Sequence, residues 1–211
     1  RQVLVYGSLG APGIDSLNFE QVALALHAGK ATALTMVGVA LIVGAAAFKL
    51  GAFPFQSWIP DVYQGAPTPT TTFLGTASKA AGAFTLFILV TGPLQPLAGK
   101  LAPLLAVGTI LTLLAGNLAA LATSDIKRVI ALSGVSHAGF ILAAITALVV
   151  SGEVEGFNRN LLSYYMLAYI VGSYLTAQAL VSIPVAEDHR RPLLGLRGLL
   201  RRSPIIASAL S

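Results

Sequence analysis

The stretch Ala47-Phe48-Lys49-Leu50-Gly51-Ala52-Phe53-Pro54-Phe55 places one charge and one helix breaker inside the longest apolar run of this chain. The run extends over residues 31–63, although about 20 apolar residues suffice to cross roughly 30 Å of hydrocarbon. Pro54 has no N–H, so it leaves the carbonyl of Leu50 without its helical donor, and Gly51 adds backbone freedom. The stretch therefore predicts a helix that is broken near 48–54, with Gly51 and Pro54 at the break.

The break divides the run into two predicted half-helices, residues 31–47 and 53–63. Non-helical backbone at membrane depth is tolerated only against protein or a water-filled space, and transporters use such breaks to build ion sites. We expect the break and the neighbouring Lys49 to act together, because freed carbonyls and internal water can solvate a buried ammonium. The alternative is that Lys49 extends to a membrane surface and Pro54 only kinks a helix.

The composition is that of an all-α, polytopic membrane protein. Hydrophobic residues make up 55% of the 211 residues and charged residues only 10%, whereas about a quarter of the residues are charged in soluble domains. The sequence has no cysteine and only three scattered histidines, so it predicts no disulfide, metal site or Fe–S cluster. The net charge of +5 is concentrated in one loop near the C-terminus, which favours a topology signal over a nucleic-acid surface.

Hydropathy predicts four further crossings after the broken helix, at residues 70–90, 101–122, 129–150 and 161–185. Residues 186–203 form a basic loop and residues 204–211 the start of another helix. A short, semi-polar helix is expected over residues 16–28, with Ser16 as its N-cap. Because the sequence begins at Arg1 and stops inside an apolar run, we expect an internal piece of a longer protein.

Lysine and arginine in the short loops predict the orientation. Arginines at positions 190, 191, 197, 201 and 202 assign the loop 186–203 to the cytoplasmic side. Counting back through the spans assigns the loops 124–128 and 61–69 to the same side. The predicted location is a bacterial inner membrane, with this chain as a multi-pass protein in the lipid bilayer.

Lys79 and His137 also lie at mid-depth in predicted spans. Lys79 is the tenth of 21 residues in the span 70–90, and its stem is too short to cover about 15 Å of hydrocarbon. An ionisable group at this depth costs about 2.5–3.5 kcal/mol and is a candidate for proton or ion transport. A fixed ion pair is the alternative for Lys79. His137 suits a proton relay, and a hydrogen bond that only packs two helices together would have the same sequence pattern.

Two blocks of the sequence resemble a known family. The first is Phe53-Pro-Phe-Gln-Ser-Trp-Ile-Pro-Asp-Val-Tyr-Gln-Gly-Ala-Pro-Thr-Pro69, followed by Thr76-Ala-Ser-Lys79, and the second runs from Asn117 through Ser124-Asp-Ile-Lys-Arg128 to His137-Ala-Gly139. They resemble the antiporter-like membrane subunits of respiratory complex I, and the wording Pro-Asp-Val-Tyr-Gln-Gly is similar to that of subunit N, the subunit 2 family.

This resemblance implies an antiporter-like, inverted-repeat bundle of about fourteen helices with one discontinuous helix in each repeat. It implies that Lys49 and Lys79 belong to a proton path. A glutamate that pairs with the first lysine and a lysine of the second broken helix are absent from the sequence, and the resemblance places them beyond its two ends.

The resulting hypothesis is a proton-translocating, non-redox subunit of NADH:quinone oxidoreductase, with Lys49, Lys79 and His137 in the path. Its expected partners are the other membrane subunits of complex I and the bilayer, and not nucleic acid. The chain itself is expected to hold no cofactor, because NADH, FMN, Fe–S clusters and quinone belong to other subunits in this family. A multisubunit cation/proton antiporter and a structural spacer in the membrane arm remain as alternatives.

Overall fold

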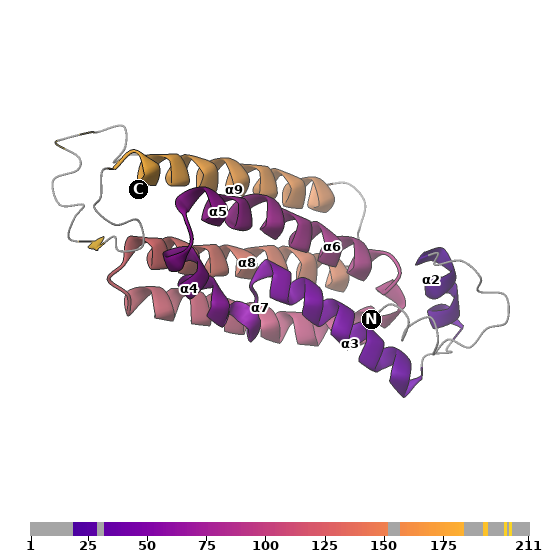
Figure 1. Ribbon diagram of the computed structural model, residues 1–211. Helices are drawn as coiled ribbons and strands as arrows, with labels where there is room; N and C mark the ends of the chain where they lie inside the picture. The colour runs from indigo at the N-terminus through magenta and orange to yellow at the C-terminus, as the bar shows by residue number, and fades with distance from the viewer. Residues whose placement is uncertain are drawn as a thin grey trace.

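The computed structural model describes residues 19–28, 32–151 and 157–183, together with 192, 193, 201 and 203. Long helices form a bundle in which α3 to α9 lie roughly side by side, and the short α2 packs at one end of it (Figure 1). The only β-type contact among these residues is an isolated bridge between Asp125 and Pro192. The helices are α2 Phe19–His27, α3 Ala33–Leu50, α4 Trp58–Gly65, α5 Thr68–Phe73, α6 Lys79–Thr91, α7 Ala98–Leu121, α8 Ile126–Ser151 and α9 Phe157–Val181.

The predicted discontinuous helix is confirmed, as α3 followed by α4. Gly51 ends α3 in the left-handed conformation, with φ of 81°. Its N–H donates to the carbonyl of Phe48 and the N–H of Ala52 donates to that of Ala47, which is the hydrogen-bond pattern of a Schellman cap. The cap therefore satisfies two of the carbonyls that the end of the helix frees.

The second half-helix begins later than the sequence predicts. Instead of starting at residue 53, α4 starts at Trp58, after a turn and a short 3₁₀ segment, Phe55–Ser57. Proline fixes its own φ and disfavours helical geometry in the residue before it, so Phe53 and Pro54 remain in the turn. The gap between the two half-helices is consequently wider than a simple proline kink.

Within the part of the chain that the structure describes, four segments are long and apolar enough to cross a membrane: Ala33–Gly65, Thr68–Thr91, Gln95–Leu121 and Ile126–Ser151. The predicted fifth crossing corresponds to α9, which is a 25-residue helix but is not among these four. Tyrosine, serine and glutamine side chains make α9 more polar than the others. The predictions for residues 1–6, for Ser16, for most of 186–203 and for 204–211 lie outside the described residues.

Helix α8 occupies the centre of the bundle and contacts α4, α6, α7 and α9. Small residues bring α7 and α8 together: a Cβ at Gly116 would lie 2.9 Å from the backbone nitrogen of Ser136, and one at Gly139 would lie 2.7 Å from the side chain of Leu113. Close backbone approach of this kind is how helices pack in lipid, where apolar burial alone gives little advantage. The position of α8 therefore brings it into contact with four other helices.

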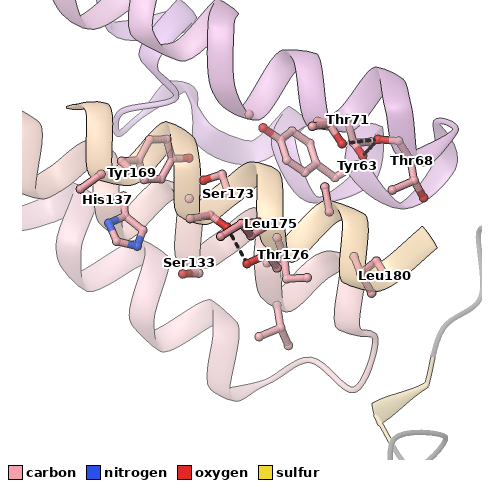
Figure 2. Close-up of a pocket in the computed structure, with 18 of the residues that line it drawn as sticks. Tyr63, Thr68, Thr71, Ser133, His137, Tyr169, Ser173, Leu175, Thr176 and Leu180 are labelled. Carbon is pink, nitrogen blue, oxygen red and sulfur yellow. Dashed lines mark hydrogen bonds between the residues drawn. The ribbon is translucent and has the colours of Figure 1, made fainter. Parts of the chain in front are cut away.

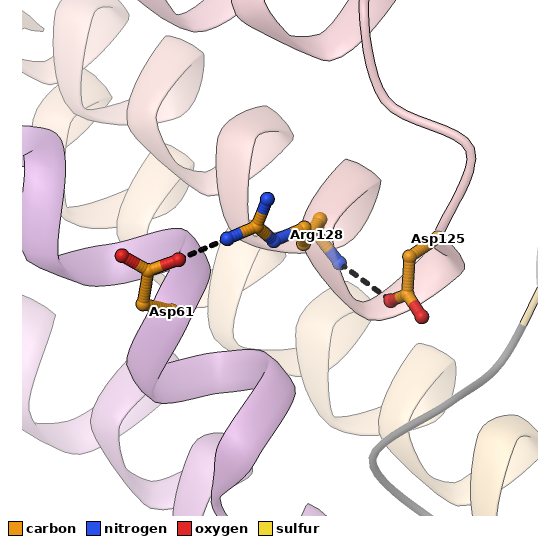
Figure 3. Close-up of polar contacts among 3 residues, drawn as sticks. All are labelled: Asp61, Asp125 and Arg128. Carbon is orange, nitrogen blue, oxygen red and sulfur yellow. Dashed lines mark hydrogen bonds and ion pairs between the residues drawn. The ribbon is translucent and has the colours of Figure 1, made fainter.

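Polar contacts join several segments at one end of the bundle. The Lys127 ammonium donates to the carbonyl of Ala66 at 2.8 Å, and Arg128 forms an ion pair with Asp61 (Figure 3). The N–H of Leu193 donates to the carbonyl of Ser124 at 2.9 Å. Parts of the segments 61–69, 124–128 and 186–203, which the charge pattern assigns to one side of the membrane, therefore lie at the same end.

Candidate functional site

Lys79 is the first residue of α6 and is almost completely buried, with 2% of its surface exposed. Its ammonium donates a hydrogen bond of 2.5 Å to the backbone carbonyl of Gly134 on α8. It also lies 5.6 Å from the centre of the Tyr169 ring on α9, within the range of a cation–π contact. No carboxylate of the described residues pairs with Lys79, so its partners within that part of the chain are a neutral carbonyl and an aromatic face.

Gly134 provides the space for this ammonium. A Cβ at position 134 would lie 3.0 Å from the Lys79 nitrogen and 3.4 Å from the Tyr169 hydroxyl. The missing side chain therefore lets an amine approach the backbone of α8 from the side. Sequence reasoning did not find Gly134, because only the packing of α6, α8 and α9 identifies it. Tyr169 was expected only as one of several tyrosines that either line a hydrated path or pack at helix interfaces.

A π-helical segment, Leu74–Ser78, immediately precedes Lys79. Such segments are rare and frequently occur at functional sites. The sequence predicted one regular helix over 70–90, and the observed segment interrupts it. Thr72 and Thr76 back-bond to the carbonyls four residues earlier, at 2.8 and 2.7 Å, a contact that often bends helices. This irregularity was not predicted from the sequence, and the threonine-rich run is the local feature that accompanies it.

His137 lies one turn after Gly134 on α8 and is half-buried. Its Nδ1 is 2.7 Å from the hydroxyl of Tyr165, and its ring centre is 4.9 Å from that of Tyr169. Tyr169 therefore contacts both the Lys79 ammonium and the His137 ring. The structure brings two of the three predicted site residues into one cluster around this tyrosine.

A cavity of about 670 Å³ lies beside this cluster, between α4, α5, α8 and α9. It reaches from Val129 to His137 along α8, which corresponds to about 12 Å at 1.5 Å per residue. Figure 2 shows side chains from several helices around it, and hydroxyl groups come from Tyr63, Thr68, Thr71, Thr72, Ser133, Tyr165, Tyr169, Ser173 and Thr176. The volume and these polar groups suit several water molecules.

The cavity begins at the end of the bundle where the polar contacts lie. Thr68 at the start of α5, Val129 near the start of α8 and Leu180 near the end of α9 line it there. Its other end is at His137 and Tyr165. A hydrated cavity with this course would extend from one membrane face to the residues around Lys79.

Lys49 is exposed on the described part of the chain. The expectation that Lys49 and Lys79 are both buried is therefore wrong for Lys49. It lies in the last turn of α3, where the neighbouring Leu50 takes the inward position with no exposed surface. Its backbone contacts α6: a Cβ at Gly82 would lie 3.3 Å from the Lys49 carbonyl carbon and 3.1 Å from the Leu50 nitrogen. Lys49 thus approaches the helix that carries Lys79, but its side chain is not in the cluster around Tyr169.

A family model described as NADH:quinone oxidoreductase/Mrp antiporter, transmembrane, matches residues 2–211. The chain belongs to this family. It is 40% identical to NADH-quinone oxidoreductase subunit N 1 of Opitutus terrae and 35% identical to subunit N of Halorhodospira halophila, in each case over 99% of its own length. It spans 42% of the length of each of these relatives.

Solved structures agree with this membership. The chain is 35% identical to a chain of respiratory complex I from Thermus thermophilus with bound aureothin, with a TM-score of 0.64 over 98% of this chain and 41% of that one. A chain of the Mrp complex from Dietzia superposes with a TM-score of 0.77 over 99% of this chain and 36% of that one, and at 20% identity this likeness concerns the fold alone. The predicted antiporter-like, all-α membrane fold is confirmed.

Proposed function

We propose that this chain moves protons within a NADH:quinone oxidoreductase, as a membrane subunit without a redox centre of its own. The redox chemistry and its cofactors NADH, FMN, Fe–S clusters and quinone would belong to other subunits. Lys79 would be the proton-carrying group at mid-depth. The neighbouring subunits would be membrane proteins, and the membrane a bacterial inner membrane with the loops 61–69, 124–128 and 186–203 on the cytoplasmic side.

The observation that supports this proposal is the environment of Lys79. Its amine is bound to the carbonyl of Gly134, and a neutral amine keeps N–H groups that can still donate this hydrogen bond, although more weakly than an ammonium. The contact therefore survives loss of the proton. No carboxylate of the described residues holds Lys79 in its charged form. A lysine that served only as a fixed ion pair would need such a partner.

The hydroxyl-lined cavity would supply protons to this site. Water in it would be in contact with His137, Tyr165 and Tyr169, which surround the Lys79 end. Histidine is the residue type whose unperturbed charge change lies closest to neutral pH, and the Nδ1 of His137 already contacts the Tyr165 hydroxyl. We assign His137 to the relay between the cavity and Lys79.

Lys49 would act about one turn further along α6, where it lies against Gly82. It occupies the negative end of the α3 dipole, where the last carbonyls favour a cation. Moving one charge against 100 mV requires about 2.3 kcal/mol, which is small enough for changes in the surroundings of a lysine to provide. Lys49 would be charged when an anionic group outside the described residues is near, and would pass its proton towards Lys79 when that group withdraws.

The test is Lys79→Met in the complete, purified complex reconstituted into vesicles. The expected result is at least a tenfold loss of proton pumping, since groups that transfer protons typically contribute about 10²- to 10⁴-fold. Lys100→Met is the matched control, because Lys100 is exposed in the first turn of α7 and should tolerate the same change. Unchanged pumping in Lys79→Met would remove Lys79 from the path.

The family description also names Mrp antiporters, so cation/proton exchange is the second candidate. Curated relatives at 35–40% identity are named as subunit N, which favours the first candidate. One measurement on vesicles without NADH distinguishes these two candidate functions. Sodium-driven proton movement under that condition would favour the antiporter, and its absence together with NADH-driven pumping would favour the oxidoreductase.

A further inference from the structure

The break between α3 and α4 has one backbone donor that is satisfied by another helix. The N–H of Phe53 donates a 3.0 Å hydrogen bond to the side-chain oxygen of Thr112 on α7, 59 residues away in sequence. In a continuous helix this N–H would donate to the carbonyl of Lys49. The other donors of the turn remain local: Gly51 and Ala52 donate to the end of α3, and Phe55 donates to Ala52 at 2.7 Å.

Thr112 is well placed to hold this contact. It has no exposed surface, and its own O–H donates to the carbonyl of Gly108 at 2.6 Å. The O–H is thereby directed along α7, which leaves an oxygen lone pair for the Phe53 N–H. Both polar groups are satisfied by this arrangement, as buried polar groups in folded proteins generally are.

Side-chain packing supports the ends of the turn, where Ala52 is buried and the Phe55 ring meets Phe48 of α3 edge-on, but gives little support to Phe53 itself. Phe53 is 37% exposed, Phe55 is 39% exposed, and Pro54 between them is also exposed. The flanking half-helices have separate anchors, because α3 packs on α6 and α4 packs on α8. The contact with Thr112 is the hydrogen bond that ties the turn itself to a third element, α7.

We propose that Thr112 is a positioning residue for proton transfer, which holds the turn at Phe53 and thereby fixes the end of α3 that carries Lys49. This inference rests on the proposed function, since it assigns to Thr112 the task of keeping Lys49 at a defined place beside α6. The hydroxyl of Thr112 takes no part in proton transfer itself. Its effect is exerted through the backbone of residues 50–53.

Three substitutions test the proposal in the complete complex. Thr112→Val keeps the shape of the side chain and removes the acceptor, whereas Thr112→Ser keeps the hydroxyl and should restore the contact. Thr109→Val is the matched control: Thr109 lies almost one turn earlier on α7, is also buried, and its hydroxyl donates to the carbonyl of Leu105 on its own helix.

The first measurement is hydrogen–deuterium exchange at the amide of Phe53, which reports the contact whether or not protons are pumped. Exchange should be about fivefold faster in Thr112→Val, the change expected for one hydrogen bond, and close to the unmodified rate in Thr112→Ser and Thr109→Val. An equal rate in Thr112→Val and the unmodified complex overturns the proposal. If Thr112→Val does not assemble, the exchange rate of the Phe53 amide in the unmodified complex is the test. Fast exchange overturns the proposal, and strong protection of this amide from exchange supports it.

The second measurement is the number of protons pumped per quinone reduced. A purely structural defect would lower the amount of complex and leave this ratio unchanged, which would overturn the positioning role. The proposal expects the ratio to fall at least twofold in Thr112→Val and to recover in Thr112→Ser. Because exchange at Phe53 is independent of transport, a failure of the proposed function in Lys79→Met can be distinguished from a failure of this inference.

Discussion

Lys79 and Lys49 are the same residue type on adjacent helices, and the fold gives them opposite surroundings. Lys79 is 2% exposed and bound to the carbonyl of Gly134, whereas Lys49 is exposed in the last turn of α3. Both lie against glycines, Lys79 through its amine at Gly134 and Lys49 through its backbone at Gly82. The comparison teaches that depth in the membrane does not fix the environment of a charge, because packing encloses the amine of Lys79, whereas at Lys49 it reaches only the main chain and the base of the side chain.

Arginine substitutions are expected to give the largest difference between the effects of changing Lys79 and changing Lys49. Arginine keeps its charge and cannot release its proton in a protein, and its guanidinium is larger than an ammonium. Lys79→Arg should therefore reduce proton pumping at least tenfold and also weaken the packing against Gly134. Lys49→Arg should reduce pumping with little change in assembly, because the exposed site has room. The checks are the pumping rate and the amount of subunit in the purified complex, and equal assembly defects in both variants would contradict the comparison.

Gly51→Ala should damage the Lys49 side of the molecule specifically. The left-handed conformation of residue 51 costs a non-glycine residue about 1–2 kcal/mol, and the new Cβ would collide with the side chain of Ile59. A destabilisation of about 2 kcal/mol or more is expected, measured as a lower thermal dissociation temperature of the subunit. Gly65→Ala is the control, since a Cβ there meets nothing within 4 Å. Equal thermal dissociation temperatures for Gly51→Ala and Gly65→Ala would show that a side chain at position 51 does not strain the turn.

Alanine substitution of Gly82 and of Gly134, the two glycines that contact these lysines, should have smaller effects, and the effects should differ between the two positions. At Gly82 the new Cβ would meet the backbone of Lys49 and Leu50, which cannot move cheaply, so a cost of about 1–2 kcal/mol is expected. At Gly134 it would meet the flexible end of Lys79, which can shift by a few tenths of an ångström. Gly134→Ala should thus leave stability nearly unchanged and reduce pumping severalfold. Thermal stability and pumping rates measured on both variants check this. A larger loss of stability in Gly134→Ala than in Gly82→Ala would contradict it.

The smallest effect is expected at the ion pair of Asp61 and Arg128. Both side chains are partly solvent-exposed, at 70% and 38%, and exposed pairs contribute about 0–1 kcal/mol. Asp61→Asn should therefore lower the stability by less than about 1 kcal/mol, and the difference should shrink at high salt. A double-substitution cycle with Arg128→Gln measures the pair alone. A coupling well above 1 kcal/mol would show that this end of α4 is more firmly held than its exposure indicates.

The sequence predicted the features that local chemistry determines. Proline at 54 and glycine at 51 located the break, hydropathy located four of the five predicted spans, and the position of Lys79 within its span indicated burial. The family resemblance, carried by residues 53–69 and 117–139, predicted the antiporter-like fold, which is confirmed. The predicted roles of Lys49, Lys79 and His137 remain proposals.

Features that depend on contacts between distant segments were not predicted. The partners of Lys79 come from α8 and α9, and the acceptor for Phe53 comes from α7, so no local pattern indicates them. The exposure of Lys49 also follows from packing, because Leu50 occupies the inward position beside it. The later start of α4 reflects how many residues the turn needs, which the positions of glycine and proline alone do not determine.

The π-helical segment Leu74–Ser78 determines how far α6 is rotated about its own axis relative to α5. Thr68, Thr71, Thr72 and Gly75 line the cavity at α-helical spacing, and on a regular helix of 100° per residue Lys79 would return to within about 20° of Thr68. The wider turn takes up roughly one additional residue, so α6 is rotated by about a quarter of a revolution, and Lys79 is not among the residues that line the cavity. Deleting one residue between 74 and 78 would undo this rotation and turn the amine into the cavity, where water would replace the carbonyl of Gly134 as its partner.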